Sequence, residues 1–237
     1  MPVTDATIIV PTRHEADNAP VLAARASLCL AGSGLDAELL FVDDSDDHTP
    51  TVLADLAERY GPVGVLHRSA GERRGGLAGA VLAGIAATDS EVVAVMDGDL
   101  QHPPELLGAL IAPVLGGDAD IAIATRYAGG GAAGGLAGPG RRLVSRASRR
   151  AVGLVLPRLR SISDPLGGYF AMRRSVVDGA ALQPDGFKIL LEVLAGGSWE
   201  RTVEVPYSFA PRHAGTSNAS VETGWRFVRQ LGRLAGA

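Results

Sequence analysis

The stretch VVAVMDGDLQHPPE, residues 92–105, decides the fold class. Its first five residues, 92–96, are apolar and rich in valine. The apolar run stops at Asp97, and Pro103 and Pro104 then open an acidic, helix-forming segment. A short buried strand followed by a proline-led helix start is typical of an α/β unit. Because ligands of such sheets bind beyond the carboxyl ends of the strands, the stretch predicts a ligand site where its strand ends.

Two carboxylates stand at this strand end, on Asp97 and Asp99. Residues two apart on an extended backbone point to the same side, so these side chains repel each other unless a cation or a donor shares them. Hard oxygen ligands, with Gln101 nearby, suit Mg²⁺ or Mn²⁺, which proteins commonly share with substrate phosphates. Taken alone, the short D-x-D motif is as typical of a solvated surface turn as of a metal site.

The first half of the chain alternates strand and helix patterns. Strands are expected at Thr7–Val10, Glu38–Val42, Val63–His67, Glu91–Met96 and Asp120–Ala124. Helices are expected near Pro20–Leu30, Thr51–Tyr60, Gly76–Ala87 and Pro104–Leu115. This alternation predicts an α/β fold with a mostly parallel central sheet and helices on both faces.

Polar residues follow four of these strands directly. They occupy residues 11–15, 43–47, 97–99 and 125–127. Because the carboxyl ends of parallel strands meet at one edge of a sheet, these residues predict a ligand crevice along that edge. The acidic run 43–47 is also typical of a helix-entry turn, and the two interpretations are compatible.

The second half of the chain has a different order. Residues 128–140 are rich in glycine, which is typical of an inert linker or of a binding loop. Residues 141–160 carry seven arginines. An amphipathic basic helix of this kind lies on an anionic membrane surface or binds phosphate, or else packs on the core as a solvated helix. The residues expected to share its apolar stripe are Leu143, Ala147, Leu154 and Val155. A helix at 186–195, a strand Arg201–Val205 and an amphipathic helix from Ser220 complete the expected elements.

Composition excludes several classes of protein. The 237 residues fit one large α/β domain, and the formal net charge of −4 argues against a nucleic-acid binder with a basic face. Cys29 is the single cysteine, so no internal disulfide is possible and a reducing compartment is expected. The N-terminus lacks the charged start of a signal peptide, and no apolar run reaches the roughly 18 residues of a membrane span. A soluble chain is therefore expected, with membrane contact left open.

Eight motifs stand in a recognisable order along most of the chain. They are PTRHEADN (11–18), FVDDSDDHTP (41–50), GGLAGAVLAG (75–84), MDGDLQHPPE (96–105), DIAIATRYAGG (120–130), SDPLGGYFAMRR (163–174), GFKILLEVL (186–194) and EVPYSFAPRHAGTS (204–217). The series resembles glycosyltransferase family 2, a group with the GT-A fold, and within it the dolichol-phosphate (polyprenol-phosphate) mannose synthase type. The resemblance implies one catalytic domain, with a nucleotide-sugar-binding half at 1–126. An acceptor loop, the basic helix and a C-terminal extension on the acceptor side follow at 127–237.

The resemblance implies that mannose passes from GDP-mannose to a polyprenyl monophosphate with inversion. Implied partners are therefore GDP-mannose, the polyprenyl phosphate lipid and a membrane surface, with no nucleic acid. Relatives that continue into transmembrane helices imply either a catalytic subunit with a membrane-subunit partner or a piece of a longer protein. The implied location is cytoplasmic, peripheral at the cytoplasmic face of a membrane.

Site residues follow from the motif matches. Metal ligands for Mg²⁺ or Mn²⁺ are Asp97, Asp99 and Gln101. The donor-binding set is Pro11, Thr12, Arg13, Glu15, Asp43, Asp44, Asp97, Gly98, Asp99, Gln101, Arg126, Lys188 and Arg212. Within that set, the resemblance assigns Asp43 and Asp44 to guanine and ribose, which suits carboxylates because guanine presents N–H donors. Many relatives carry an aromatic residue where Arg13 stands.

The acceptor side of the implied site is basic. Its phosphate-binding residues are Arg142, Ser145 and Arg146, and Arg212 matches a family arginine in the pattern R-x-x-G-x-S-K, here RHAGTSN. Asn218 thus replaces the family lysine. A phosphate monoester with a second pKa near 6 is largely dianionic at neutral pH, so neither Asp99 nor His102 is needed as an obligatory base.

The catalytic residues are expected to be Asp99 and Arg126, acting through charge and position. Asp164 is expected to be structural or near the acceptor, and no histidine stands at zinc-ligand spacing.

The same sequence features are compatible with other functions. Another polyprenyl-phosphate glycosyltransferase, using UDP-glucose or a related donor, would show the same motifs because sugar choice depends on a few pocket contacts. A non-catalytic nucleotide-sugar-binding regulator is indicated only by Asn218. A nicotinamide-binding enzyme is disfavoured, because GGLAGAVLAG lacks G-x-G-x-x-G spacing directly after a strand.

Overall fold

A seven-stranded sheet forms the centre of the computed structural model, which describes residues 4–132, 139–183, 188–209 and 221–236, with the backbone alone at 139–143 and 221–223. The strands are β1 (Ala6–Thr12), β2 (Ala37–Asp43), β3 (Val63–His67), β4 (Val92–Val95), β5 (Ile121–Thr125), β6 (Phe170–Arg173) and β7 (Thr202–Pro206). The helices are α1 (Ala19–Ser33), α2 (Thr49–Arg59), α3 (Gly76–Ala86), α4 (Leu107–Leu115), α5 (Pro139–Val155), α6 (Ile189–Gly196) and α7 (Val221–Ala235). Short 3₁₀ turns lie at Pro104–Leu106, Pro157–Leu159 and Arg174–Val177.

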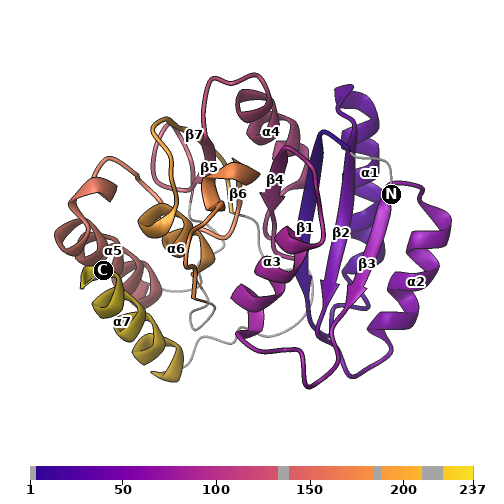
Figure 1. Ribbon diagram of the computed structural model, residues 1–237, viewed down its shortest axis with the longest axis horizontal. Helices are drawn as coiled ribbons and strands as arrows, with labels where there is room; N and C mark the ends of the chain where they lie inside the picture. Colours follow the sequence, from indigo (N-terminus) through magenta and orange to yellow (C-terminus); the bar gives the residue numbers. More distant parts are fainter. Residues whose placement is uncertain (1–3, 133–138, 184–187, 210–220, 237) are drawn as a thin grey trace.

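The strands are ordered β3-β2-β1-β4-β6-β5-β7 (Figure 1). β1, β2, β3 and β4 are parallel, and β5 pairs in parallel with β7. β6 lies between β4 and β5 and runs antiparallel to both. The carboxyl ends of six strands therefore share one edge with the amino end of β6.

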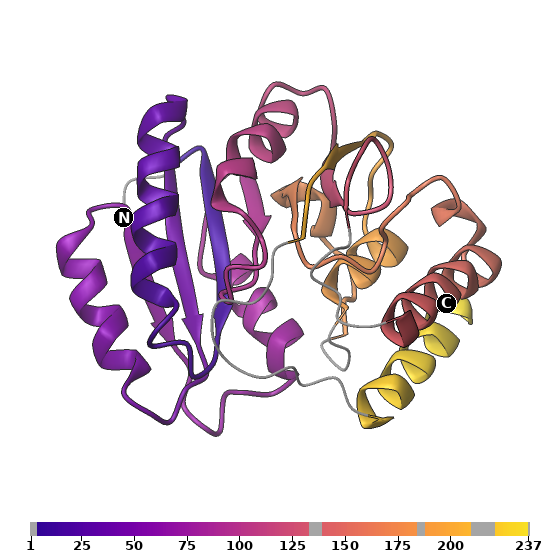
Figure 2. The same cartoon turned by 180° about the vertical axis from the view of Figure 1, so that it is seen from behind.

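Helices cover both faces of the sheet, as Figures 1 and 2 show from opposite sides. α1, α2 and α4 pack on one face, around Ile8, Leu39 and Phe41. α3 and α6 pack on the other, around Ile9 and Phe170, and α5 and α7 add Val152 and Leu231 to that core. Alternation of side chains along each strand explains the two cores, since successive residues face opposite layers.

The predicted elements are confirmed where the structure describes them, with ends shifted by a few residues; residues 133–138 of the predicted glycine-rich segment, 186–187 of the predicted helix and Ser220 lie outside the described residues. β6 was not predicted as a strand. α5 was expected from residue 141 and begins at Pro139, inside the segment predicted as a loop. Its predicted apolar stripe is partly wrong: Val152 is the residue that reaches the core, whereas Leu154 is 73% exposed. The assignment of one catalytic domain divided at residue 126 stays a prediction.

α5 and α7 lie side by side at one end of the molecule, far from α2 (Figures 1 and 2). Both helices are amphipathic, with their apolar residues gathered on one side. Within the described ranges, no helix has the length and apolar character that a membrane crossing needs.

Candidate active site at the sheet edge

Three neighbouring strands end level with one another at the predicted crevice. In the pairing register, Thr12 lies beside Asp43, and Asp43 lies beside His67. β6 runs antiparallel to its neighbours, so its amino end lies at this edge. The segment that precedes it, residues 164–169, therefore also borders the crevice. An antiparallel strand thus adds a loop that no parallel strand of the sheet would place there.

The D-x-D loop after β4 is held in a strained turn. Leu100 has φ 62° although it is not glycine, and its side chain is buried. The amide of Gln101 donates to Oδ1 of Asp99 at 3.1 Å, and the amide of Asp97 donates to Nδ1 of His102 at 3.1 Å. Left-handed backbone at a non-glycine residue persists where surrounding contacts impose it, often at functional sites. The loop therefore presents Asp97 and Asp99 in one fixed arrangement.

His102 is a buried, neutral side chain that accepts a hydrogen bond from the backbone of this loop. Its ring stacks on Tyr169 with centroids 5.0 Å apart and also packs against Tyr207 and Phe209. Burial lowers the pKa of His102 to about 4, against a smaller opposing effect of Asp99. Because Nδ1 accepts the amide of Asp97, the neutral ring is occupied as a structural acceptor. This agrees with the expectation that His102 is no obligatory base.

The donor atoms at the loop fit a hard divalent cation. Asp97 is 37% exposed at its side chain, whereas Asp99 and Gln101 are buried. A Cβ at Gly168 would lie 3.2 Å from both carboxylate oxygens of Asp97, so a larger residue there would push this carboxylate by a few tenths of an ångström. Among the described residues, no three histidine, cysteine or acidic side chains are arranged so that they could hold a metal ion by themselves. Two carboxylates and an amide are nevertheless a suitable set for Mg²⁺ or Mn²⁺, which take further ligands from phosphates and water.

A cationic wall faces the loop from β5 and α6. Arg126 binds the buried carboxylate of Asp164 through Nε at 2.7 Å and through its second nitrogen at 2.9 Å. Although burial opposes it, this hydrogen-bonded ion pair raises the pKa of Arg126. The ammonium of Lys188 donates to the carbonyl of Leu166 at 3.0 Å. Burial first, and then the charge of Arg126, lower the pKa of Lys188. Two partly buried cations beside a carboxylate pair form a setting for phosphate groups.

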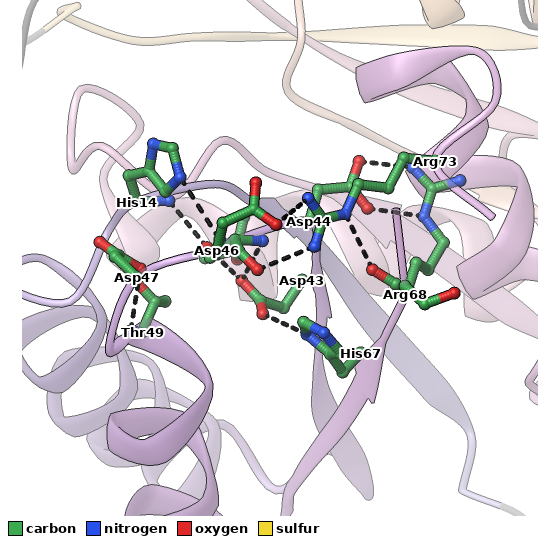
Figure 3. A network of polar contacts seen from close by, with 12 residues as sticks. His14, Asp43, Asp44, Asp46, Asp47, Thr49, His67, Arg68 and Arg73 are labelled. Carbon is green, nitrogen blue, oxygen red and sulfur yellow. Dashed lines mark hydrogen bonds and ion pairs between the residues drawn. The ribbon is translucent and has the colours of Figure 1, made fainter. Parts of the chain in front are cut away.

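The acidic turn after β2 is held by two arginines that sequence reasoning missed. Arg68 donates to Asp44 through Nε to Oδ1 at 2.8 Å and through Nη2 to Oδ2 at 2.6 Å, and Arg73 donates to Oδ1 of Asp46 at 2.6 Å. Figure 3 shows both pairs. Both arginines follow β3, the parallel neighbour of β2. Because the ends of neighbouring parallel strands meet, the pairing of an acidic run after one strand with a basic run after the next was the available signal.

The two residues predicted to bind the nucleoside, Asp43 and Asp44, are therefore already hydrogen-bonded to other protein side chains. Asp43 is fully buried and accepts hydrogen bonds from the Ser45 hydroxyl at 2.5 Å and from Nδ1 of His67 at 2.7 Å. Asp44 is engaged by Arg68. The alternative role of this run as a helix entry is also present, since Asp47 accepts the amide of Thr49 at the start of α2.

The first predicted donor loop follows β1 and borders the acidic turn. His14 has φ 57°, and its amide donates to the Ser45 hydroxyl at 2.8 Å. Glu15 accepts from the side chain of Asn18, while Thr12 is buried and donates to a carbonyl of its own strand. Arg13 is exposed and Pro11 half-buried at the crevice edge. The two left-handed non-glycine residues described in this protein both lie in predicted donor loops.

The acceptor segment on α5 is joined to the site through Tyr127. Its hydroxyl lies 2.7 Å from that of Ser145, and the guanidinium of Arg149 sits 3.9 Å from its ring centroid. Arg149 also donates to the carbonyl of Ser163 at 2.8 Å, so it holds structure rather than facing solvent. Arg146 and Arg150 are exposed. The side chain of Arg142, and all of Arg212 and Asn218, lie outside the described residues.

A shallow apolar groove of about 520 Å³ separates α5 from α7. It is lined by Ala147, Ser148, Ala151, Gly224, Trp225, Phe227 and Val228. Trp225 is 69% exposed. Basic residues of both helices, including Arg146, Arg150 and Arg229, are exposed on the same elements. Exposed tryptophan next to arginine is typical of a surface that lies in a membrane interface.

Comparison with protein families gives a match over most of the chain. The model described as glycosyl transferase family 2 matches residues 7–179. A dolichol-phosphate mannosyltransferase of Pyrococcus furiosus is 38% identical over 229 residues, covering 96% of this chain and 63% of that protein. A dolichol-phosphate mannosyltransferase of Saccharomyces cerevisiae is 32% identical, and the match covers 96% of this chain and 86% of the yeast protein. The chain thus spans less than two thirds of the length of its archaeal relative.

Solved structures share the fold at low sequence identity. Mannosyl-3-phosphoglycerate synthase from Rubrobacter xylanophilus superposes with a TM-score of 0.72 at 19% identity, covering 97% of this chain and 73% of that one. Glucosyl-3-phosphoglycerate synthase from Mycobacterium tuberculosis, in complex with Mg²⁺ and UDP, gives a TM-score of 0.69 at 17% identity, with coverages of 98% and 80%. These likenesses confirm the predicted fold as the GT-A type.

Proposed function

Because the chain belongs to glycosyltransferase family 2, we propose that it transfers mannose from GDP-mannose to a polyprenyl monophosphate with inversion. The observation that carries the proposal is the pairing of a carboxylate loop with a cationic wall at one sheet edge. This pairing occurs in a chain 38% identical to a dolichol-phosphate mannosyltransferase. The product is a polyprenyl-phosphate-mannose of the β configuration.

We assign the diphosphate of the donor to the space between the D-x-D loop and the cationic wall. Asp97, Asp99 and Gln101 are the residues that would hold Mg²⁺ or Mn²⁺, which when bound supplies positive charge to the departing diphosphate. Arg126 adds a charge that Asp164 keeps in position, because the bidentate pair fixes its guanidinium plane. A preorganised cation of this kind stabilises charge that develops during the reaction.

The reaction is a single displacement at C1 of mannose. An oxygen of the lipid phosphate forms the new bond to C1, and the bond from C1 to the β-phosphate oxygen breaks with its electron pair leaving on GDP. The lipid phosphate is largely dianionic at neutral pH, so no side chain has to remove a proton. Positioning and charge account for the rate under this proposal, consistent with the structural role of neutral His102.

The acceptor side of the proposal is the α5 region. Ser145 and Arg146, together with Arg142 and Arg212, would bind the lipid phosphate, and Lys188 would contact the donor phosphates. The exposed Trp225 and the arginines of α5 and α7 would rest on an anionic membrane surface. We place the protein at the cytoplasmic face of a membrane, with a membrane subunit or a further segment of a longer protein as its partner.

A transfer assay tests the proposal and separates it from its rivals. The protein is mixed with polyprenyl phosphate in detergent, Mg²⁺ or Mn²⁺, and one labelled donor: GDP-mannose, UDP-glucose or UDP-GlcNAc. We expect labelled lipid only from GDP-mannose, and we expect Asp99→Ala to abolish it. Asp55→Ala, at an exposed site on α2, serves as the matched control. Lipid product from a UDP-sugar alone would refute the mannosyl proposal, and nucleotide binding without turnover would favour a regulator.

A further inference from the structure

We propose that Gln230 of α7 is a positioning residue for Lys188, the lysine assigned above to the donor phosphates. The side-chain nitrogen Nε2 of Gln230 donates to the main-chain carbonyl of Lys188 at 3.1 Å, although the two residues are 42 positions apart in the chain. This role rests on the proposed function. It also places α7 on the donor side of the site, whereas the sequence predicted the C-terminal extension to serve the acceptor.

Lys188 is held at both ends of the residue. It is the N-cap of α6, with φ −102° and ψ 73°. Its carbonyl accepts the amide of Glu192 at a long 3.4 Å, so the contact from Gln230 is the shorter of these two bonds. At the other end, the ammonium donates to the carbonyl of Leu166 at 3.0 Å. Because the backbone and the tip of the side chain are both fixed, the ammonium has a defined place in the crevice.

That place lies among the charges of the crevice. Burial first, and then the charge of Arg126, lower the pKa of Lys188. The carboxylates of Asp97 and Asp164 act in the opposite direction. An ammonium that is influenced by Arg126 and by the D-x-D loop at once lies where the proposed diphosphate binds. Since the interaction between charges weakens with distance, a shift of the lysine backbone would weaken its contact to a phosphate.

A buried carboxylate on α6 orients the amide of Gln230. Glu192 is 1% exposed, and its Oε1 accepts from Nε2 of Gln230 at 2.7 Å. The nitrogen therefore faces two acceptors, this carboxylate and the carbonyl of Lys188. A reversed amide would place its own oxygen against both of them, so only one orientation is satisfactory. Oε1 of Gln230 is buried and has no hydrogen-bond partner among the described residues. The nitrogen alone thus determines how this side chain is held.

Arg233, three residues further along α7, compensates the charge of the carboxylate. It donates to the same oxygen, Oε1 of Glu192, and its side chain is 29% exposed. A buried ion pair is seldom more stabilising than apolar side chains of similar volume, because both charges lose water. What this pair provides is direction, since it docks α7 on α6 in the register that brings Gln230 to Lys188.

A double-mutant cycle tests this role. The apparent KM values for GDP-mannose and for polyprenyl phosphate are measured in the transfer assay. The proteins are the unaltered chain, Gln230→Met, Lys188→Met and the double variant. Methionine has the length of glutamine but cannot donate to the carbonyl of Lys188. Leu231→Ala is the matched control, because it removes buried packing at the next residue of α7 and leaves the hydrogen bonds in place. Urea unfolding of each variant measures the change in stability.

We expect Gln230→Met to raise the KM for GDP-mannose by about threefold to tenfold, and to leave the KM for the lipid within about twofold. In the Lys188→Met background the same substitution should change the KM for GDP-mannose by less than about twofold, because the lysine that it positions is gone. Leu231→Ala should lower the stability and leave both KM values unchanged. Gln230→Asn is too short to reach the carbonyl, so it should act like Gln230→Met and takes its place if the methionine variant does not fold.

An unchanged KM for GDP-mannose in Gln230→Met would overturn this role. An equal rise in both backgrounds, or a similar rise in Leu231→Ala, would overturn it as well. Absence of transfer by the unaltered protein would instead refute the proposed function. The same cycle, measured as the Kd for GDP in the presence of Mg²⁺, would then decide the positioning role by itself.

Discussion

Replacement of His102 by asparagine tests the claim that a neutral, buried imidazole supports the D-x-D loop. The folded-state pKa of His102 is about 4, below the ordinary value of 6.5. Between these values the unfolded chain binds a proton that the folded chain excludes. The contribution to stability is therefore complete above pH 6.5 and is lost as the pH falls toward 4. The total loss is about 3 kcal/mol, from about 1.4 kcal/mol per pKa unit.

Over an accessible range, from pH 7.5 to 5.0, the same relation gives a loss of about 2 kcal/mol from this residue. The assay is urea unfolding at both pH values, with the m-value checked for constancy. His102→Asn keeps an acceptor for the amide of Asp97 but does not titrate, so we expect its stability to fall by about 2 kcal/mol less than that of the unaltered protein. His48→Asn, at an exposed histidine, serves as the control.

An identical pH dependence of stability in His102→Asn and the unaltered protein would show that His102 does not titrate with a lowered pKa. A lower stability of His102→Asn at both pH values, with a flatter slope between them, agrees with it. The lower value reflects lost packing against Tyr169, and the flatter slope reflects the lost titration. The difference in slope is therefore the quantity that decides.

Three further predictions concern the cations, the metal and the membrane. Asp164→Asn leaves the buried Arg126 without its ion pair, and we expect urea unfolding to show a loss of about 3–5 kcal/mol; a loss below about 1 kcal/mol would contradict the pairing. Gly168→Ala crowds the carboxylate of Asp97, so Mn²⁺ titration by electron paramagnetic resonance in the presence of GDP should show weaker binding, and unchanged affinity would argue against that ligand. Replacing Arg146 and Arg150 by glutamine should weaken binding to anionic vesicles by about 2 kcal/mol, about 30-fold. Arg59→Gln on α2 serves as the control and should bind vesicles like the unaltered protein. Equal vesicle binding by the double variant and the control would contradict the proposed contact of α5 with the membrane.

Local patterns were sufficient for the parallel half of the fold. Valine-rich runs such as 92–96 end at polar residues, and each is followed by a helix of ordinary length. The spacing of apolar residues indicates strand or helix, and proline and glycine mark where each element ends. Both signals can be read within about 15 residues of the chain. The crevice followed from the same patterns, because strand ends of a parallel sheet share one edge.

Long-range pairing explains what the patterns missed. β6 has four residues, 170–173, and inserts antiparallel between β4 and β5, a choice made by packing on neighbours far away in the chain. The bidentate pair between Arg126 and Asp164 depends on that insertion, so sequence spacing gave no sign of it. For the same reason, Arg68 became visible only when the ends of β2 and β3 were placed side by side.

Surface helices were read correctly in type and less well in orientation. The high arginine content of α5 predicted an amphipathic helix, but did not specify which residues face the core. Val152 is buried and Leu154 is exposed. Residues two positions apart point about 200° away from each other around a helix, so the face that packs on the core is nearly opposite to the one that Leu154 indicated. Arg149 contacts Tyr127 and Ser163, so its replacement would disturb the fold as well as any membrane contact. Arg150 is exposed and is therefore the better residue with which to test membrane contact.

The configuration of the lipid product shows whether the lipid phosphate displaces GDP in a single step. The protein is incubated with GDP-mannose carrying ¹³C at C1, polyprenyl phosphate and Mg²⁺, and the lipid fraction is examined by mass spectrometry and by the one-bond C1–H1 coupling in NMR. We expect one mannose on the lipid phosphate, in the β configuration. Free mannose without lipid product, or an α-linked lipid product, would contradict a single displacement by the lipid phosphate at this site.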